Sequence, residues 1–327
     1  MDTIKVSIIV PVYGVENFIE RCARSLFEQT MEEGIEFIFV NDCTKDKSVE
    51  ILYNIIEKYP KRIPYIKILH HKSNKMAAGA RNTGLDNACG EFVCMVDADD
   101  YLQTDMISIL YKKAIDTQSD IVSSNSFLQY ENKAVKYCIK KRNKKEDYLV
   151  DILDRTSSTA WWGRIYKRCL FEDNKIRINT DMTGAGEDYS TVSRVFYYAK
   201  KVELIEECLY NYVQYNPQAF TKNNLAIKQI YDIIKTSELV DDFFKDKEQI
   251  YKDAIEKGKV LGNLSHAFNF KDVELQKKGF NTFKNVNYQK FYPQLKWQYR
   301  ITYVLAKNNL FRVLNLLTRV YKKIKLL

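Results

Sequence analysis

Carboxylates gather in one short segment, Asp97-Ala98-Asp99-Asp100, which directly follows an apolar run. In an extended backbone residues i and i+2 point the same way, so Asp97 and Asp99 would present neighbouring carboxylates. Two such groups repel each other unless a cation or hydrogen-bond donors compensate them. Hard oxygen ligands suit Mg²⁺ or Mn²⁺, and these ions bridge diphosphates. The alternative is a solvated acidic turn that caps the helix expected from Leu102.

Two more candidate residues follow apolar runs. Asp42 comes after Glu36–Val40, and a carboxylate there can accept a hydrogen bond from a uracil N–H or a ribose hydroxyl. A cluster that caps the next helix is the other interpretation. Tyr13 follows Lys5–Val12 and could stack on a base, although an aromatic residue there is as often part of a core.

The segment Gly79–Gly84 surrounds Arg81 with small residues. These allow close approach of the backbone, and the planar guanidinium suits a diphosphate. An ordinary helix start bounded by glycine is the alternative. The chain has neither G-x-G-x-x-G nor G-x-x-x-x-G-K-[ST], so dinucleotide-binding folds and P-loops lose support.

Two further pairs have both a chemical and a structural interpretation. Glu187 and Asp188 follow the loop Thr183–Gly186 at an expected helix start, where acidic residues also favour the helix dipole. Trp161 and Trp162 are two of three tryptophans. Their rings could stack on sugar faces, or they could belong to the core.

The elements that position these residues alternate between strands and helices. The expected strands are Lys5–Val12, Glu36–Val40, Tyr65–Leu69, Phe92–Val96 and one near Ile121, with helices over about 15–29, 49–59, 77–88 and 104–116. This alternation is typical of an α/β fold with a parallel sheet, whose ligands bind beyond the carboxyl ends of the strands. Tyr13, Asp42 and Asp97 all fall at such ends, which indicates a small-molecule site.

Composition excludes several classes of protein. With 46% hydrophobic and 28% charged residues, the chain is neither disordered nor a multi-span membrane protein. The seven cysteines form no C-x-x-C pair, and with three histidines a zinc site has little support. The N-terminus shows no signal peptide, and no apolar run approaches the roughly 20 residues of a bilayer span. We therefore expect a cytoplasmic protein with reduced thiols.

The alternation fades after about residue 130, so we expect an α/β domain over 1–220 and a helical region over 221–327. The net charge is +9, yet the last acidic residue is Glu274, and twelve Lys or Arg follow it. Residues 310–324 predict a basic amphipathic helix. Its charge fits a membrane, a nucleic acid or an acidic protein. The body lacks a basic stripe with interleaved aromatics, so we expect an anionic membrane surface and no nucleic acid. Packing of the helix on the body is the alternative.

Together and in this order, the motifs resemble the family 2 glycosyltransferases with the GT-A fold. The matching elements span about residues 4–215 and are Ser7–Tyr13, Asn41-Asp42, Gly79–Gly84, Asp97–Asp100 and Glu187-Asp188. The segment Trp161–Tyr166 and the basic tail resemble the bacterial branch that builds capsules, exopolysaccharides and lipid-linked glycans. The resemblance implies a Rossmann-like, mostly parallel central sheet flanked by helices, with a C-terminal helical extension.

The resemblance also implies a role for each candidate. The implied set is Pro11 and Tyr13 at the base, Asp42 at the uracil, Arg81 at the diphosphate or donor sugar, Asp97 at the ribose, Asp99 on Mn²⁺ or Mg²⁺, Asp100, Trp161 and Trp162 at the acceptor or sugar pocket, and Asp188 as general base beside Glu187. The chain departs from the family at Cys43, where glycine is usual, and it lacks a histidine that is often found around 210–215. The departures concern the turn after Asp42 and the coordination of the metal.

The implied activity is an inverting, metal-dependent transfer of a hexose or N-acetylhexosamine from a UDP-sugar to a glycan hydroxyl, with the acceptor lipid-linked or a surface polysaccharide precursor. The enzyme would be peripheral at the inner face of the cell membrane. A sugar-phosphate nucleotidyltransferase would open with a Gly-rich loop containing an arginine, where this chain has Pro11–Glu16. A catalytically degenerate GT-A protein serving as a membrane-associated assembly partner is the other alternative. Retention of both Asp99 and Asp188 argues against it.

Overall fold

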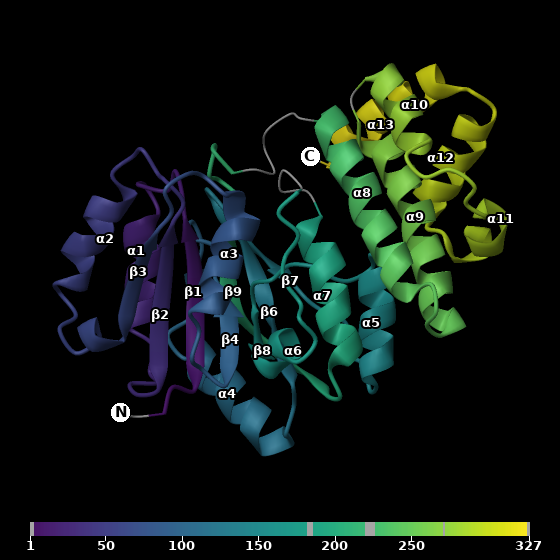
Figure 1. Cartoon of the computed structure of the whole chain (residues 1–327). Coiled ribbons are helices and arrows are strands. Elements are labelled where there is room, and N and C mark those ends of the chain that lie inside the picture. The colour runs from purple at the N-terminus through teal and green to yellow at the C-terminus, as the bar shows by residue number, and fades with distance from the viewer. Residues whose placement is uncertain (1–2, 182–185, 220–225, 271, 326–327) are drawn as a thin grey trace. The chain divides into compact units, whose positions relative to one another are not determined.

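A computed structural model describes residues 3–181, 186–219, 226–270 and 272–325 (Figure 1). The chain divides into two units. The first comprises Met1–Tyr148 and Thr159–Asn223, and the second comprises Leu149–Ser158 and Asn224–Leu327. The second unit therefore includes a short piece from the middle of the first, which nothing in the sequence pattern indicates.

The first unit is built on a mixed sheet. In the part of the chain that the structure describes, nine strands form it in the order β3-β2-β1-β4-β8-β6-β9-β5, with β7 paired to β6. The strands are β1 (Val6–Val12), β2 (Ile35–Asn41), β3 (Ile66–His70), β4 (Phe92–Met95), β5 (Tyr101–Leu102), β6 (Ile121–Tyr130), β7 (Lys133–Tyr137), β8 (Arg164–Lys167) and β9 (Val202–Val213). Strands β3, β2, β1 and β4 are mutually parallel, as are β6 and β9, whereas β5, β7 and β8 pair antiparallel. The expected α/β architecture is confirmed.

Helices cover both faces of the parallel half. Val6, Ile8 and Val10 share one core with residues of three helices, whereas Ile9 points to the other face. There α3 comes so close that a Cβ on Gly84 would lie 2.2 Å from Cγ2 of Ile9. Burial of both faces explains why β1 is apolar throughout rather than alternating. The helices are α1 (Ile19–Phe27), α2 (Ser48–Ile56) and α4 (Met106–Thr117) at the first core, α3 (Met76–Asp86), α6 (Cys169–Glu172), α7 (Glu187–Tyr198), the 3-10 turn η1 (Ile63–Tyr65), and α5 (Lys145–Leu153), which runs from the first unit into the second.

The second unit is helical. Its elements are α8 (Ala226–Phe244), α9 (Gln249–Asn269), α10 (Val273–Phe280), α11 (Tyr288–Phe291), η3 (Tyr292–Gln294), α12 (Trp297–Lys307) and α13 (Phe311–Lys325). We call Leu149–Ser158 the borrowed segment, because it belongs to the second unit but lies within the sequence of the first. A Cβ on Gly258 of α9 would lie 2.4 Å from the carbonyl oxygen of Leu153, so glycine allows the borrowed segment to cross α9 closely. Nearby, Lys257 pairs with the buried Asp154 at 2.9 Å. None of the helices described is both long and apolar enough to cross a bilayer.

Candidate active site

Three strand ends meet at one edge of the sheet. Strand β1 pairs in parallel with β2 and β4, so Tyr13, Asp42 and Asp97 follow the ends of neighbouring strands. The Tyr13 side chain is 54% exposed. Gly14 adopts φ +67°, and its N–H donates to Oγ1 of Thr44 at 2.9 Å. This bond ties the loop after β1 to the loop after β2, next to the exposed Tyr13.

Asp42 is buried at 2% exposure and held by an unexpected partner. His71 Nδ1 lies 2.7 Å from Asp42 Oδ1, and the N–H of Lys75 donates to the same oxygen at 2.7 Å. On its other side the His71 ring contacts the hydroxyl of Thr83 in α3 at 2.8 Å. Oδ2 of Asp42 has no hydrogen-bond partner among the described residues, so it is the oxygen available to a ligand. The His70-His71 doublet at a strand end was the signal that could have identified this histidine.

The turn after Asp42 keeps a backbone shape suited to glycine. Cys43 adopts φ +59°, a left-handed conformation that glycine adopts most readily. Its Sγ donates to the carbonyl of His71 at 2.9 Å. The turn is therefore left-handed despite the Cβ of Cys43, and the side-chain contact offsets part of the steric cost.

The three carboxylates of the acidic segment after β4, Asp97, Asp99 and Asp100, have different surroundings. Asp100 is fully buried, with the Tyr210 hydroxyl donating to Oδ2 and the Val213 N–H to Oδ1, both at 2.7 Å. Burial, and then the nearby Asp99 and Asp97, raise the pKa of Asp100 well above its usual range. Both of its oxygens are used inside the protein, so Asp100 anchors the turn to β9 and offers none to a sugar.

Asp97 and Asp99 lie closer to solvent. Burial and the adjacent Asp97 raise the pKa of Asp99, whose Oδ2 accepts from Nδ2 of Asn216 at 2.8 Å. Asp97 is partly exposed, and its Oδ1 accepts from Arg81. Arg81 balances the charge of Asp97, whereas the side-chain partner of Asp99 is the neutral Asn216. Such a pair of carboxylates suits a hard divalent cation.

Asp97 and Asp99 supply too few ligands to complete a metal site by themselves. Over the described ranges of the chain, no group of three or more His, Cys, Asp or Glu side chains is arranged to hold a metal ion. The residues present thus fit Mg²⁺ or Mn²⁺ in chemistry, provided that a diphosphate and water supply most of the coordination.

Arg81 joins the acidic segment to the start of α7. The guanidinium is buried, with Nη2 2.7 Å from Oδ1 of Asp97 and Nη1 3.3 Å from Oε1 of Glu187. Although burial opposes its charge, Asp97 and Glu187 raise the pKa of Arg81. The two terminal nitrogens that were expected to bind a diphosphate thus bind carboxylates of the protein.

Glu187 and Asp188 sit at the N-terminus of α7, after Gly186 at φ +90°. Burial, and then repulsion from Asp188, raise the pKa of Glu187 to about 7, although Arg81 opposes the shift. Asp188 is less buried, and the Thr159 hydroxyl donates to its Oδ2 at 3.0 Å. Residues 183–185 of the expected glycine loop lie outside the described residues. The pair thus combines a buried acid with a more open carboxylate.

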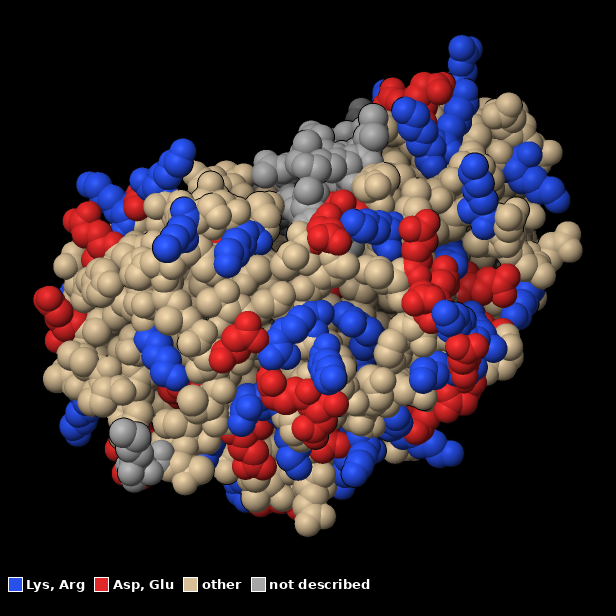
Figure 2. Space-filling view, in the orientation of Figure 1, with Lys and Arg blue, Asp and Glu red and all other residues tan. Residues whose placement is uncertain are grey.

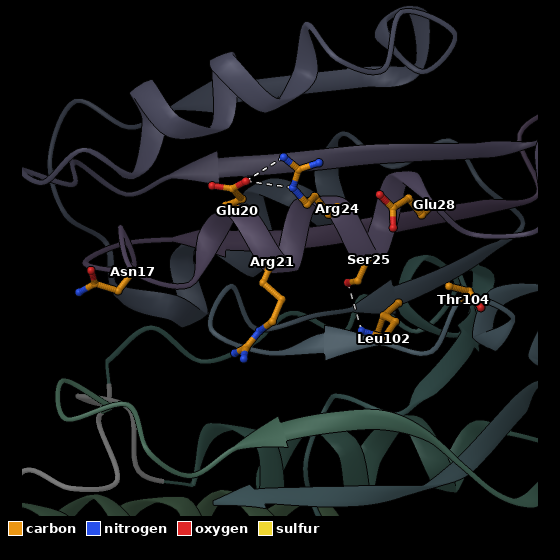
Figure 3. Close-up of a pocket in the computed structure, with 8 residues that line it drawn as sticks. All are labelled: Asn17, Glu20, Arg21, Arg24, Ser25, Glu28, Leu102 and Thr104. Carbon is orange, nitrogen blue, oxygen red and sulfur yellow. Dashed lines mark hydrogen bonds and ion pairs between the residues drawn. The ribbon is translucent and has the colours of Figure 1, made fainter. Parts of the chain in front are cut away.

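Two residues that sequence analysis did not single out hold Asp99 in place. Asn216 does so through the side chain, and Arg21 of α1 donates to the Asp99 carbonyl at 3.1 Å and to the hydroxyl of Tyr215. The Arg21 guanidinium also lies 4.4 Å from the centre of the Tyr101 ring. Figure 3 shows Arg21 pointing away from α1, among the residues that line a groove of about 580 Å³ together with Leu102 and Thr104. No local signal marks these residues, because their contacts span long stretches of sequence.

The two tryptophans face different surroundings. Trp161 is 3% exposed and packs against the rings of Tyr166 and Phe171, so it has no open face for a sugar. Trp162 is partly exposed and stacks with Tyr210 at 5.1 Å and Tyr212 at 4.9 Å between ring centres. The core interpretation fits Trp161, while Trp162 packs on Tyr210, which holds Asp100.

Comparison with known proteins identifies the family. The model described as "Glycosyl transferase family 2" matches residues 7–174, which is just over half of the chain. The chain belongs to this family. It is 33% identical over 223 residues to the glycosyltransferase GlyA of Streptococcus pneumoniae, covering 64% of this chain and 30% of GlyA. It is 34% identical over 224 residues to the uncharacterized glycosyltransferase EpsJ of Bacillus subtilis, covering 66% and 63%. The chain thus matches under two thirds of the length of either relative.

Solved structures show the same fold. S. aureus TarS 1–349 in complex with UDP-GlcNAc superposes with a TM-score of 0.73 at 18% identity, over 98% of this chain and 92% of that one. The mannosyltransferase PcManGT from Pyrobaculum calidifontis, in complex with GDP-Man and Mn²⁺, gives 0.59 at 16% identity, over 96% and 84%. The GT-A arrangement expected from the motifs is therefore confirmed.

Proposed function

We propose that this family 2 member is an inverting, metal-dependent glycosyltransferase that moves a hexose or N-acetylhexosamine from a UDP-sugar to a glycan hydroxyl. Membership of the family supports glycosyl transfer, and the TarS complex with UDP-GlcNAc supports a UDP-linked donor. The observation that carries the proposal is the connection made by Arg81, which joins Asp97 at the strand ends to the carboxylate pair that begins α7.

The base and ribose of the donor would lie over the strand ends. The exposed ring of Tyr13, beside Pro11, offers a stacking surface, and Oδ2 of Asp42 can accept from the uracil N–H. Because His71 and the Lys75 N–H both bind Oδ1 of Asp42, that side chain is already oriented before a nucleotide arrives. Asp97 would accept from a ribose hydroxyl.

Asp188 would act as the general base. It would take the proton of the acceptor hydroxyl as that oxygen attacks the anomeric carbon, and the bond from that carbon to the UDP oxygen breaks with inversion. The hydroxyl of Thr159 orients Asp188. The contact of Arg81 with a diphosphate stays a prediction for the donor-bound state.

Asp99 would hold Mn²⁺ or Mg²⁺, with Asp97 nearby. Such an ion would neutralise negative charge on the departing diphosphate. Asn216 and Arg21 keep Asp99 in position from two sides. We further propose that the acceptor is lipid-linked or a surface polysaccharide precursor and that the protein works at the inner face of the cell membrane; the names of the relatives, which are bacterial glycosyltransferases, are compatible with this setting.

Calorimetric titration with UDP, with and without Mn²⁺ and with GDP as control, tests the proposal. We expect UDP to bind more tightly with Mn²⁺, and Asp99→Asn to remove the benefit of the ion while leaving weak UDP binding. A preference for GDP would contradict the donor assignment. Absence of nucleotide binding altogether would favour the alternative of a degenerate GT-A protein that serves as an assembly partner.

A further inference from the structure

Helix α13 buries only part of its apolar surface. Phe311 and Leu314 pack into a core with Ala267 of α9 and Ala306 of α12. A second apolar stripe of α13 stays in solvent, with Leu316 at 63% exposure. Its members, spaced by three or four residues as on one side of a helix, are Val313, Leu316, Leu317 and Val320. Packing on the body, the alternative weighed from the sequence, therefore accounts for one side of this helix and leaves the other without a partner in the described part of the chain.

Helix α12 has the same division. Thr302 and Ala306 are buried, whereas Trp297, Ile301 and Val304 are exposed, with Trp297 at 61%. Helices α12 and α13 pack on each other, and the ring of Trp297 lies 5.9 Å from that of Tyr321, near the end of the α13 stripe. We call these seven residues, Trp297, Ile301, Val304, Val313, Leu316, Leu317 and Val320, the exposed apolar face.

Helices α12 and α13 carry cations and no carboxylate. No Asp or Glu follows Glu274. On α12 and α13 the exposed side chains include Arg300, Lys307, Arg312 and Arg319, and Arg312 and Arg319 stand next to Val313 and Val320 in sequence. In Figure 2, Lys and Arg side chains project from the surface over the C-terminal helices, where an acidic group also lies among them.

We propose that the exposed apolar face docks on an anionic lipid surface, with its apolar side chains inserted shallowly and its Lys and Arg at the lipid headgroups. Tryptophan favours the boundary between headgroups and acyl chains, and cations next to an apolar stripe suit anionic lipids. A second copy of the chain fits less well. A two-fold contact through this face would bring the same arginines together with no acidic residue of α12 or α13 to balance them.

This inference rests on the proposed function only for the identity of the acceptor, since docking would bring a lipid-linked acceptor and the enzyme to one surface. The binding itself depends on α12 and α13. A measurement of lipid binding can therefore succeed or fail independently of the UDP titration.

Vesicle flotation of the full chain tests the proposal, using phosphatidylglycerol mixed with phosphatidylcholine against phosphatidylcholine alone. We expect binding to the anionic vesicles that weakens as salt rises. Leu316→Ser should weaken the partition about tenfold, because the exposed side chain inserts its hydrocarbon into the lipid. Arg312→Gln combined with Arg319→Gln should weaken it by at least as much and reduce the salt dependence.

Ile250→Ser is the matched control, because Ile250 is an exposed apolar residue of α9 outside the face, and this variant should bind like wild type. UDP binding of every variant should equal that of wild type, because the changes lie in the second unit, and an unchanged far-UV circular dichroism spectrum shows that each is folded. Equal binding to both kinds of vesicle, or unchanged binding by Leu316→Ser, would overturn the proposal. A wild-type dimer in sedimentation that Leu316→Ser dissociates would instead assign the face to a second copy. Lipid binding without UDP binding would remove the transferase proposal and leave this one in place.

Discussion

Replacing Glu187 by glutamine should remove a pH dependence from the stability of the first unit. Burial, and then Asp188, raise the pKa of Glu187 to about 7 from an ordinary value of 4.5. The folded protein thus binds this proton more tightly than the unfolded chain does. The free energy of unfolding must therefore fall as pH rises from the unfolded pKa through the folded one, and level off above about pH 8.

The size of the effect follows from the shift. A pKa higher by about 2.5 units corresponds to about 3 kcal/mol of lost stability once Glu187 is fully ionised. Between about pH 5.5 and about pH 8, roughly 2 kcal/mol of this loss should develop. Glutamine has no proton to lose, and its carbonyl oxygen can still accept from Arg81, so Glu187→Gln should lack this part of the pH dependence.

Urea unfolding followed by tryptophan fluorescence measures the difference. Trp161 and Trp162 belong to the first unit and Trp297 to the second, so a Trp297→Phe background limits the signal to the first unit. Glu33→Gln, at an exposed position, is the control and should follow the wild-type pH dependence. If Glu187→Gln also follows it, Arg81 keeps Glu187 ionised in the folded protein, and the assignment of Glu187 as a buried acid is wrong.

Three other substitutions test single steps of the reasoning. Asp188→Asn should abolish sugar transfer in a radiolabelled-donor assay while UDP binding by calorimetry survives; loss of both would make Asp188 a structural residue. Cys43→Gly should raise the free energy of unfolding by about 0.5–1 kcal/mol, because the left-handed backbone penalises a Cβ more than glycine costs in entropy, and a decrease would show that the Sγ contact with the His71 carbonyl outweighs the strain. Gly84→Ala should lower the free energy of unfolding by about 1–3 kcal/mol in the same urea experiment, because its Cβ would overlap Ile9. In a chain that already carries Ile9→Ala, Gly84→Ala should cost less than it does in the wild type. If the two changes are simply additive, the overlap is not the cause.

Local patterns sufficed to predict the parallel half of the fold. Strand β1 is an apolar, β-branched run that is buried on both faces, so its residues are almost all apolar instead of alternating with polar ones. Strands β2 and β4 are buried on both faces in the same way. Once β2 and β4 were predicted, Asp42 and Asp97 could be placed at the ends of these strands. The motif order then added the family, which a single pair of carboxylates could not have done.

Contacts between distant residues were beyond the reach of the sequence. Arg81 has a fork suited to a diphosphate, but only the fold shows that Asp97 and Glu187, 16 and 106 residues away, bind it first. Trp161 and Trp162 are adjacent and identical in type, so no pattern could tell the buried ring from the partly exposed one. The support that Asn216 gives to Asp99 spans 117 residues.

The borrowed segment, Leu149–Ser158, has a consequence for how such proteins can be recombined. The backbone passes between the two units at three places rather than through one linker. A fragment that ends near residue 223 would carry Leu153 and Asp154 without α9, where Gly258 and Lys257 receive them. Exchange of the helical unit by a single splice would therefore leave an incomplete piece on each side. A chimera that keeps these contacts must therefore exchange Leu149–Ser158 together with the segment that begins at Asn224.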